Sequence, residues 1–315
     1  MFRVRKAVIP AALFVLILLM LSSPAAYAAA CMEGIVLWAK SVLPVLFPFF
    51  VCTGILSAAG ARMADRLSPV MSRVKLPAAA ALCAVTSILS GYPVGSRCLL
   101  QLRQAGAISP KDATRVSVVC STSGPMFLVG SVGAGMLGSA AAGGILLASH
   151  LIGVFLTAAL FLPFLKKPQC ASFPALNAKA GGFAENIRSG TISVLCVGGF
   201  IAFFCVVAQA LEQTGIFALV TKAVALPLSL FSREEMAEGL TFSLLEATRG
   251  CAALSACGMS ALPFLAFAVT FGGASILAQQ IAFFKPAGVK IRVFLAVKLL
   301  QGILAALVCA LFTAF

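Results

Sequence analysis

Residues 76–97 of the chain read LPAAAALCAVTSILSGYPVGSR, an apolar run that ends in a cluster of glycine and proline. A helix that crosses the hydrocarbon core of a bilayer needs about 20 apolar residues. Leu76–Gly95 is at the short end of that length, and its final residues, Ser90-Gly91-Tyr92-Pro93-Val94-Gly95, do not favour a helix. A full crossing would also leave Arg97 and the bases after it on the outer side, against the positive-inside rule. The sequence therefore predicts a re-entrant segment.

Further apolar runs lie on both sides of this segment. The composition is 61% hydrophobic and 10% charged, whereas soluble domains carry about 25% charged residues. We therefore predict an all-α polytopic membrane protein with about eight crossings, plus one or two re-entrant segments. The runs are Ala7–Ala30, Gly34–Gly60, Val116–Leu137, Ala141–Leu165, Gly190–Leu211, a weaker Ile216–Phe231, Gly239–Ala256, Ala261–Phe284 and Val293–Phe315.

The charged and reactive residues exclude several classes of function. The net charge of +14 would suggest nucleic acid as a partner of a soluble protein. Here the bases lie in short stretches between apolar runs, where they orient the chain against an anionic cytoplasmic leaflet, so we expect no nucleic-acid partner. Most of the eleven cysteines fall in apolar runs without zinc-type spacing. With no catalytic triad, phosphate loop or metalloprotease motif, we expect no enzyme, no cofactor and no metal.

The basic residues define an orientation and a division of the chain. Residues 1–32 start with Arg3, Arg5 and Lys6, which remain inside, and form an N-terminal transmembrane anchor. The small residues Ala26-Tyr27-Ala28 also fit a signal-peptide cleavage site, and either reading leaves Glu33 outside. Residues 33–165 then form a first membrane repeat, residues 166–189 a cytoplasmic linker, and residues 190–315 a second repeat that starts from the inside.

The two halves match at low identity when one is shifted over the other by roughly 150 residues. Because the first repeat starts outside and the second inside, the sequence predicts inverted repeats. Interrupted segments in matching places of two inverted repeats are typical of a transporter's binding site. The matches are Ser41-Val42-Leu43 with Ser193-Val194-Leu195, Ser90–Arg97 with Leu244–Gly250, and Ser121–Gly130 with Thr270–Gln279.

Interrupted helices also indicate which residues bind a solute. Their free N–H and C=O groups are tolerated only against protein, water or a ligand, and half-helix N-termini attract anions. If Arg97 and Arg249 face one cavity, they suit a carboxylate or phosphate. Otherwise Arg97 belongs to a loop and Glu246, one helical turn before Arg249, neutralises that arginine. The predicted binding residues are Ser90, Gly91, Tyr92, Pro93, Gly95, Arg97, Ser123, Gly124, Pro125, Glu246, Arg249, Gly272, Gly273 and Gln279.

The stretch from Leu89 to Leu137 resembles a known family. LSGYPVGSR, QLRQAGAIS and STSGPMFLVGSVGAGML resemble the YlbJ-type sporulation integral membrane proteins, within the nucleoside recognition (gate) domain group related to concentrative nucleoside transporters. The second-half LLEATRG fits as well. Arg97 lies at a position that the resemblance implies to be basic, whereas the role of Arg249 rests on the internal repeat alone.

The resemblance implies a function in endospore-forming bacteria. It implies a transporter that moves dipicolinate, a planar aromatic dianion, from the mother cell across the outer forespore membrane by alternating access. One alternative is a carrier of nucleosides or other small solutes coupled to H⁺ or Na⁺, with Glu246 and Gln279 as candidates for ribose. Another is a non-transporting sporulation scaffold, which the lack of a long polar domain disfavours. Homo-oligomerisation stays open.

Overall fold

The computed structural model describes residues 2–55, 66–67, 69–71, 73–164 and 182–314, and these parts are helical without a strand. Most of the predicted linker, residues 166–189, lies outside the described residues, as do residues 56–65. The α-helices are α1 (Phe2–Ser22), α2 (Pro24–Leu37), α3 (Leu43–Ile55), α5 (Ala80–Ser90), α6 (Val94–Gln104), α7 (Pro110–Ser117), α8 (Ala140–Phe161), α9 (Phe183–Gln213), α10 (Ile216–Ser229), α11 (Ala237–Leu245), α12 (Ala247–Ser255), α13 (Leu262–Phe271), α14 (Gly273–Phe284) and α15 (Ile291–Ala314).

The N-terminal helices are divided by a proline. α1 ends at Ser22, and Pro24 begins α2. The backbone N–H of a first helical residue has no acceptor within the helix, so a proline there costs no hydrogen bond. α2 continues through a π-helical segment, Trp38–Val42, into α3. Residues 24–32, which the sequence assigned to the N-terminal anchor, are therefore part of the next long helix.

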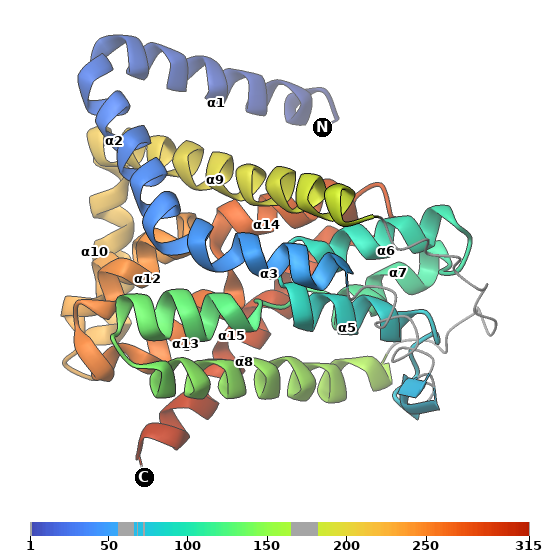
Figure 1. Cartoon of the computed structure of the whole chain (residues 1–315). Coiled ribbons are helices and arrows are strands. Elements are labelled where there is room, and N and C mark those ends of the chain that lie inside the picture. The colour runs from blue at the N-terminus through green and yellow to red at the C-terminus, as the bar shows by residue number, and fades with distance from the viewer. Residues whose placement is uncertain (1, 56–65, 68, 72, 165–181, 315) are drawn as a thin grey trace.

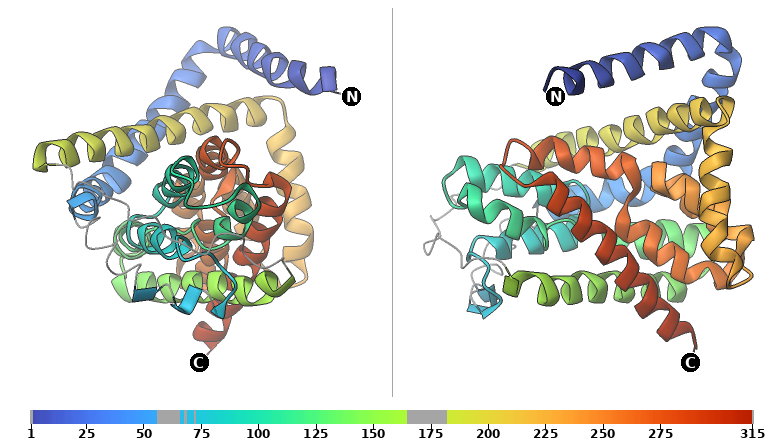
Figure 2. Two further views of the ribbon diagram at one scale, coloured as in Figure 1. Left: turned by 90° about the vertical axis from the view of Figure 1, so that its right-hand side faces the viewer. Right: turned by 180° about the vertical axis from the view of Figure 1, so that it is seen from behind.

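Long apolar helices make up the body of the molecule. In Figure 1, α8 and α9 both run roughly horizontally, whereas α10 is upright at the left end of the molecule. Figure 2 shows the same arrangement from behind, with α15 crossing the bundle obliquely. Within the described residues, five helical stretches are long and apolar enough to span a bilayer: Pro24–Cys52, Ala140–Phe164, Phe183–Gln213, Gly258–Phe284 and Ile291–Ala314. The prediction of an all-α polytopic membrane protein is confirmed.

Four interruptions divide the apolar runs of the described chain, and one of them lies within Gly258–Phe284. The pairs α5–α6 and α11–α12 each pack as a hairpin of two short helices. α7 is followed by an extended stretch and a π-helical segment, Met126–Met136, and α13 is followed directly by α14. Each half-helix has 8 to 12 residues, which is too short to cross a bilayer alone.

The two hairpins approach the middle of the molecule from opposite ends. In Figures 1 and 2, α5 and α6 lie at the end away from α10, while α12 lies beside α10. Apart from α10, each half of the described chain then shows the same order: a long helix, a hairpin, a broken span and a final long helix. Opposite entry and equal order are what inverted repeats produce.

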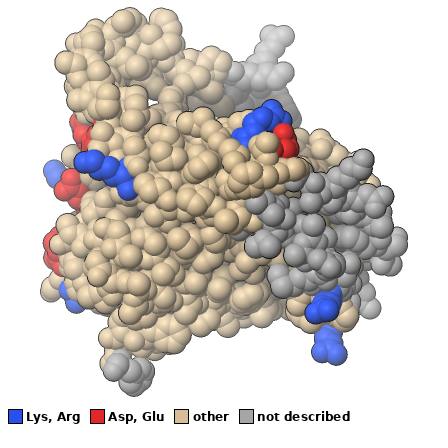
Figure 3. All heavy atoms as spheres, in the orientation of Figure 1, with Lys and Arg blue, Asp and Glu red and all other residues tan. Residues whose placement is uncertain are grey.

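Charges gather at the two ends of the bundle. Figure 3 shows a broad face of uncharged atoms between them, as expected for a surface in contact with lipid. The end formed by the α6–α7 and α14–α15 connections carries Lys111, Lys285 and Lys290, and the Lys290 N–H donates to Thr114 Oγ1 at 3.0 Å. The α10 end carries Glu234 and Glu238. By the positive-inside rule, we expect the first end to be the cytoplasmic one.

Candidate functional site

The first hairpin and the first broken span meet through glycines. α5 ends at Ser90, and Gly91 takes φ +73°, a left-handed conformation that favours glycine. The Tyr92–Pro93 peptide bond is cis, and α6 begins at Val94. A Cβ at Gly91 would lie 2.5 Å from the Gly124 nitrogen, in the extended stretch after α7. The two interruptions therefore touch backbone to backbone.

The second half repeats this contact with different residues. Glu246 separates α11 from α12 and caps α12, since its Oε2 accepts from the Arg249 N–H at 2.7 Å. The α13–α14 break is built by Gly272 and Gly273, with φ of +88° and +64°. A Cβ at Gly273 would lie 2.3 Å from the Ser243 carbonyl oxygen of α11. In both halves the hairpin thus packs directly on the break of the broken span.

A small cavity of about 50 Å³ lies where the four interruptions converge. Half of the predicted binding residues line it, including Glu246 as its acidic group. Polar groups and apolar side chains from both halves share its wall, which is the composition expected of a solute site. The lining residues are Val42, Leu46, Ser90, Gly91, Tyr92, Ser123, Gly124, Phe127, Val197, Ile201, Glu246, Thr248, Ile276 and Gln279.

A wider cavity of about 570 Å³ adjoins the small one, and the two share Ser90 and Gln279. It adds two predicted residues, Pro93 and Arg97. Arg97 is exposed, and no carboxylate in the described part of the chain pairs with it. The lining residues are Phe50, Thr86, Ser90, Pro93, Val94, Arg97, Asn186, Ser189, Gly190, Ile192, Ser193, Cys196, Phe200, Gln279, Ala282 and Phe283.

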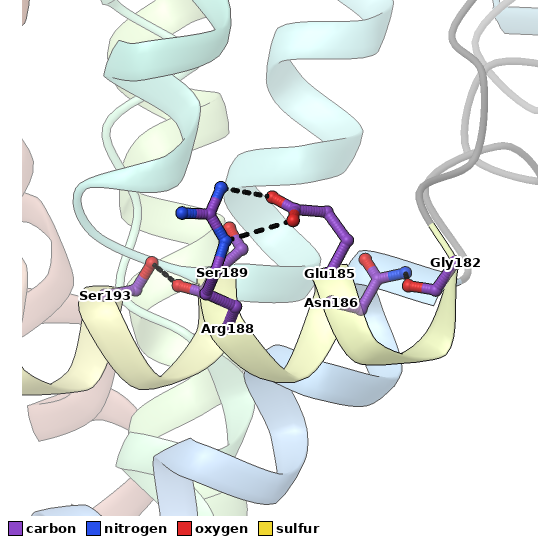
Figure 4. A network of polar contacts seen from close by, with 6 residues as sticks. All are labelled: Gly182, Glu185, Asn186, Arg188, Ser189 and Ser193. Carbon is purple, nitrogen blue, oxygen red and sulfur yellow. Dashed lines mark hydrogen bonds and ion pairs between the residues drawn. The ribbon is translucent and has the colours of Figure 1, made fainter.

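The first turns of α9 show why Arg97 is the cation of this wall. Arg188 lies in these turns of α9, but its guanidinium donates two hydrogen bonds to Glu185, of 3.0 and 2.9 Å (Figure 4). Both side chains are exposed. Asn186 and Ser189, between and beside them, line the cavity instead. Arg188 is thus neutralised by a local partner, whereas the charge of Arg97 is available to a solute.

Arg249 does not join Arg97 at either cavity. Its guanidinium pairs with Glu33 of α2 at 3.2 Å and with Glu212 of α9 at 3.4 Å, and it lies over the Phe242 ring. Glu246 binds the backbone N–H of Arg249 and not its side chain. The predicted alternatives for Arg249, a ligand contact or neutralisation by Glu246, therefore both differ from the observed ion pairs. Carboxylates from both halves of the chain therefore hold this arginine between α2 and α9.

Four other predicted residues shape the backbone next to the site. A Cβ at Gly95 would lie 2.4 Å from the Cys120 carbonyl oxygen, so this glycine permits close packing of α6. Gly272 and Gly273 shape the second break, and Pro125 precedes the π-helical segment. These four residues line neither cavity.

The sequence interpretation missed Lys298, in the first third of the last apolar run. Its side chain is fully buried, and Nζ donates to the Tyr92 hydroxyl at 2.9 Å and to the Ser121 carbonyl at 3.1 Å. The Tyr92 hydroxyl donates in turn to the Thr270 carbonyl at 3.1 Å. A charged residue within an apolar run was the available signal, because such residues are costly in a membrane.

His150 extends this buried network between the two broken spans. Its Nε2 accepts from the Ser123 N–H at 2.9 Å, so Nδ1 carries the proton and donates to Thr270 Oγ1 at 2.9 Å. This bonding pattern belongs to a neutral imidazole. Lys298, Tyr92, His150 and Thr270 together join the first hairpin, the first break and the end of α13.

Comparisons with known proteins agree with the resemblance seen in Leu89–Leu137. The chain is 26% identical to the sporulation integral membrane protein YlbJ of Bacillus subtilis (strain 168) over 321 aligned residues. The alignment covers 91% of this chain and 77% of that protein. No family model matches the chain, and no solved structure does. The similarity supports the resemblance to the YlbJ type and the integral membrane character; the nucleoside recognition domain stays a prediction.

Proposed function

We propose that this chain, which resembles the YlbJ sporulation type, is a transporter of a small anionic aromatic solute. The first candidate is dipicolinate, moved into the forespore. The observation that carries this proposal is the convergence of two hairpins and two broken spans on one cavity. Inverted repeats with such a midplane site are suited to alternating access.

The wider cavity has the chemistry for a planar anion. Its volume of about 570 Å³ falls among typical small-molecule sites. Arg97 supplies a guanidinium for a carboxylate, and Phe50, Phe200 and Phe283 supply aromatic surface. The inner cavity, at about 50 Å³, has room for one or two water molecules. In this conformation a solute would therefore occupy the wider cavity, on the cytoplasmic side of the interruptions.

The inner cavity favours a second candidate, a nucleoside or another hydroxylated solute. Glu246 and Gln279 line it and offer a carboxylate and an amide to hydroxyl groups. A buried carboxylate also repels a dianion that moves past it. The two cavities thus point to different ligand charges, and a binding experiment separates them.

The experiment is a thermal-shift titration of the purified full chain with dipicolinate, uridine and adenosine. A ligand that binds the folded state raises its apparent stability. We expect stabilisation by dipicolinate that Arg97→Gln abolishes and Arg188→Gln retains, because Arg188 is paired with Glu185 at the same end of the molecule.

The other outcomes are equally decisive. Stabilisation by uridine or adenosine that Glu246→Gln abolishes, without an effect of dipicolinate, would replace the anion by a nucleoside. No stabilisation by any of the three would contradict a transporter of these solutes and favour the scaffold.

A further inference from the structure

Lys298 has surroundings that a purely packing residue does not need. In α15 it is fully buried, and its ammonium lies 5.0 Å from the centroid of the Tyr92 ring. Its hydrogen-bond acceptors, the Tyr92 hydroxyl and the Ser121 carbonyl, are neutral. No carboxylate in the described part of the chain lies within ion-pair distance of Nζ. The cation is therefore held by neutral groups, two oxygen atoms and the Tyr92 ring.

Those oxygen atoms belong to parts that alternating access would move. Tyr92 is the tip of the α5–α6 hairpin and lines the inner cavity, and Ser121 begins the first break. Tyr92 also reaches Thr270 at the end of α13, in the other repeat. The ammonium thus joins a cavity wall to both broken spans.

Resting on the proposed transport function, we propose that Lys298 carries the coupling proton of the transport cycle. With the proton bound, Nζ donates to Tyr92 and Ser121 and holds the hairpin tip on the first break. Release of the proton to water leaves a neutral amine with a lone pair, which accepts from the Tyr92 hydroxyl. That hydroxyl then leaves the Thr270 carbonyl, and Ser121 loses a charge-assisted bond. Proton binding and release therefore make and break the link between hairpin and broken spans.

The neighbouring titratable groups do not replace Lys298 in this role. Tyr92 bonds to Lys298 from the hairpin. His150 of α8 reaches the same network through Thr270, and its Nε2 accepts from the Ser123 N–H. α13 presents the carbonyl and hydroxyl of Thr270. α7 carries Lys111, Asp112 and Arg115 but packs on the start of α15 near Lys290, about 12 Å along the helix from Lys298.

The first test needs no solute. Lysine labelled with ¹³C at Cε is incorporated into the full chain, which has eleven lysines, and its signals are followed against pH. Water-exposed lysines titrate near ~10.4. The proposal requires one signal that titrates apart from the water-exposed lysines and that is missing in Lys298→Arg. If every lysine signal titrates like a water-exposed lysine, the proposal is wrong. This outcome can be observed with the wild type alone.

The second test measures transport in proteoliposomes with dipicolinate and uridine as probes. An imposed pH gradient, without Na⁺, is expected to increase wild-type uptake of the transported probe several-fold. Arg keeps its proton at all usable pH values, so Lys298→Arg should retain exchange of the probe and lose the response to the gradient. Lys298→Gln should behave in the same way.

The outcomes separate this inference from the proposed function. A gradient response that survives in Lys298→Arg would show that the ammonium only bridges oxygen atoms, and would overturn the inference while transport stands. Absence of exchange for both probes in the wild type would contradict the transport function, and the lysine titration would then decide by itself whether Lys298 exchanges its proton.

Discussion

At the residue scale, the first repeat depends on two glycines whose backbones touch. Gly91 combines a left-handed φ with a distance of 2.5 Å between its would-be Cβ and the Gly124 nitrogen. A side chain at this position has to displace backbone, which cannot rotate away as a flexible side chain can.

Gly91→Ala is therefore expected to destabilise the protein by about 3 kcal/mol, from conformational strain and overlap together. The matched control is Gly144→Ala, in the second turn of α8, where a Cβ meets nothing within 4 Å. Thermal unfolding of the two variants in the same detergent measures the difference. Equal stability of both would show that the hairpin and the break are not in contact.

The two arginines that the sequence treated as a pair are expected to respond differently to mutation. Arg249 holds α12 against α2 and α9 through partly exposed ion pairs, so Arg249→Gln should cost ~1 kcal/mol of stability. It should leave ligand affinity within about twofold, because a change below ~0.4 kcal/mol is expected for a residue outside both cavities. Arg97→Gln should lower ligand affinity and leave stability nearly unchanged. Thermal unfolding with and without ligand gives both quantities, and lost affinity in Arg249→Gln would place that side chain at the solute.

At the element scale, the short helices form hairpins because neither half can cross a bilayer and because the connecting residues reverse the chain. Gly91 and the Tyr92–Pro93 pair do this between α5 and α6, and Glu246 does it between α11 and α12. We therefore expect each hairpin to begin and end on one side of the membrane.

Cysteine accessibility checks this arrangement. In a background without native cysteines, Lys75→Cys and Gln104→Cys flank the first hairpin, and Glu238→Cys and Ser260→Cys flank the second. All four positions are exposed. We expect a membrane-impermeant thiol reagent to label the first two from the cytoplasmic side and the last two from the opposite side. Labelling of Lys75→Cys and Gln104→Cys from different sides would turn the first hairpin into a crossing.

At the scale of the whole molecule, the cavities predict from which side a solute enters under the proposed function. The wider cavity reaches Cys196, near the middle of the 31-residue helix α9. A thiol at that depth is reached by a polar reagent only through water.

Native Cys196 should therefore react with an impermeant thiol reagent in inside-out vesicles and not in right-side-out vesicles. A bound solute should slow the reaction. Cys196→Ser is the control that removes the signal while the other cysteines remain. Reaction from the outer side alone would mean that the resting conformation opens in the other direction.

The sequence by itself determined the membrane class, the interrupted segments and half of the residues that line the inner cavity. These follow from short-range properties: twenty apolar residues span a bilayer, glycine and proline interrupt helices, and basic residues stay inside. The re-entrant reading of Leu76–Gly95 came from the same rules, and the structure shows α5 and α6 folded as a hairpin there.

Only the tertiary structure decided which groups face one another. Arg249 lies three residues from Glu246, yet it pairs with Glu33 and Glu212, which are brought to it by α2 and α9. Lys298 meets Tyr92 across 206 positions of the chain. The physical reason is that a helix fixes the direction of a side chain, whereas its partner depends on which helix packs against that face. Membrane insertion is thus encoded locally, and the polar network at the centre is created by packing.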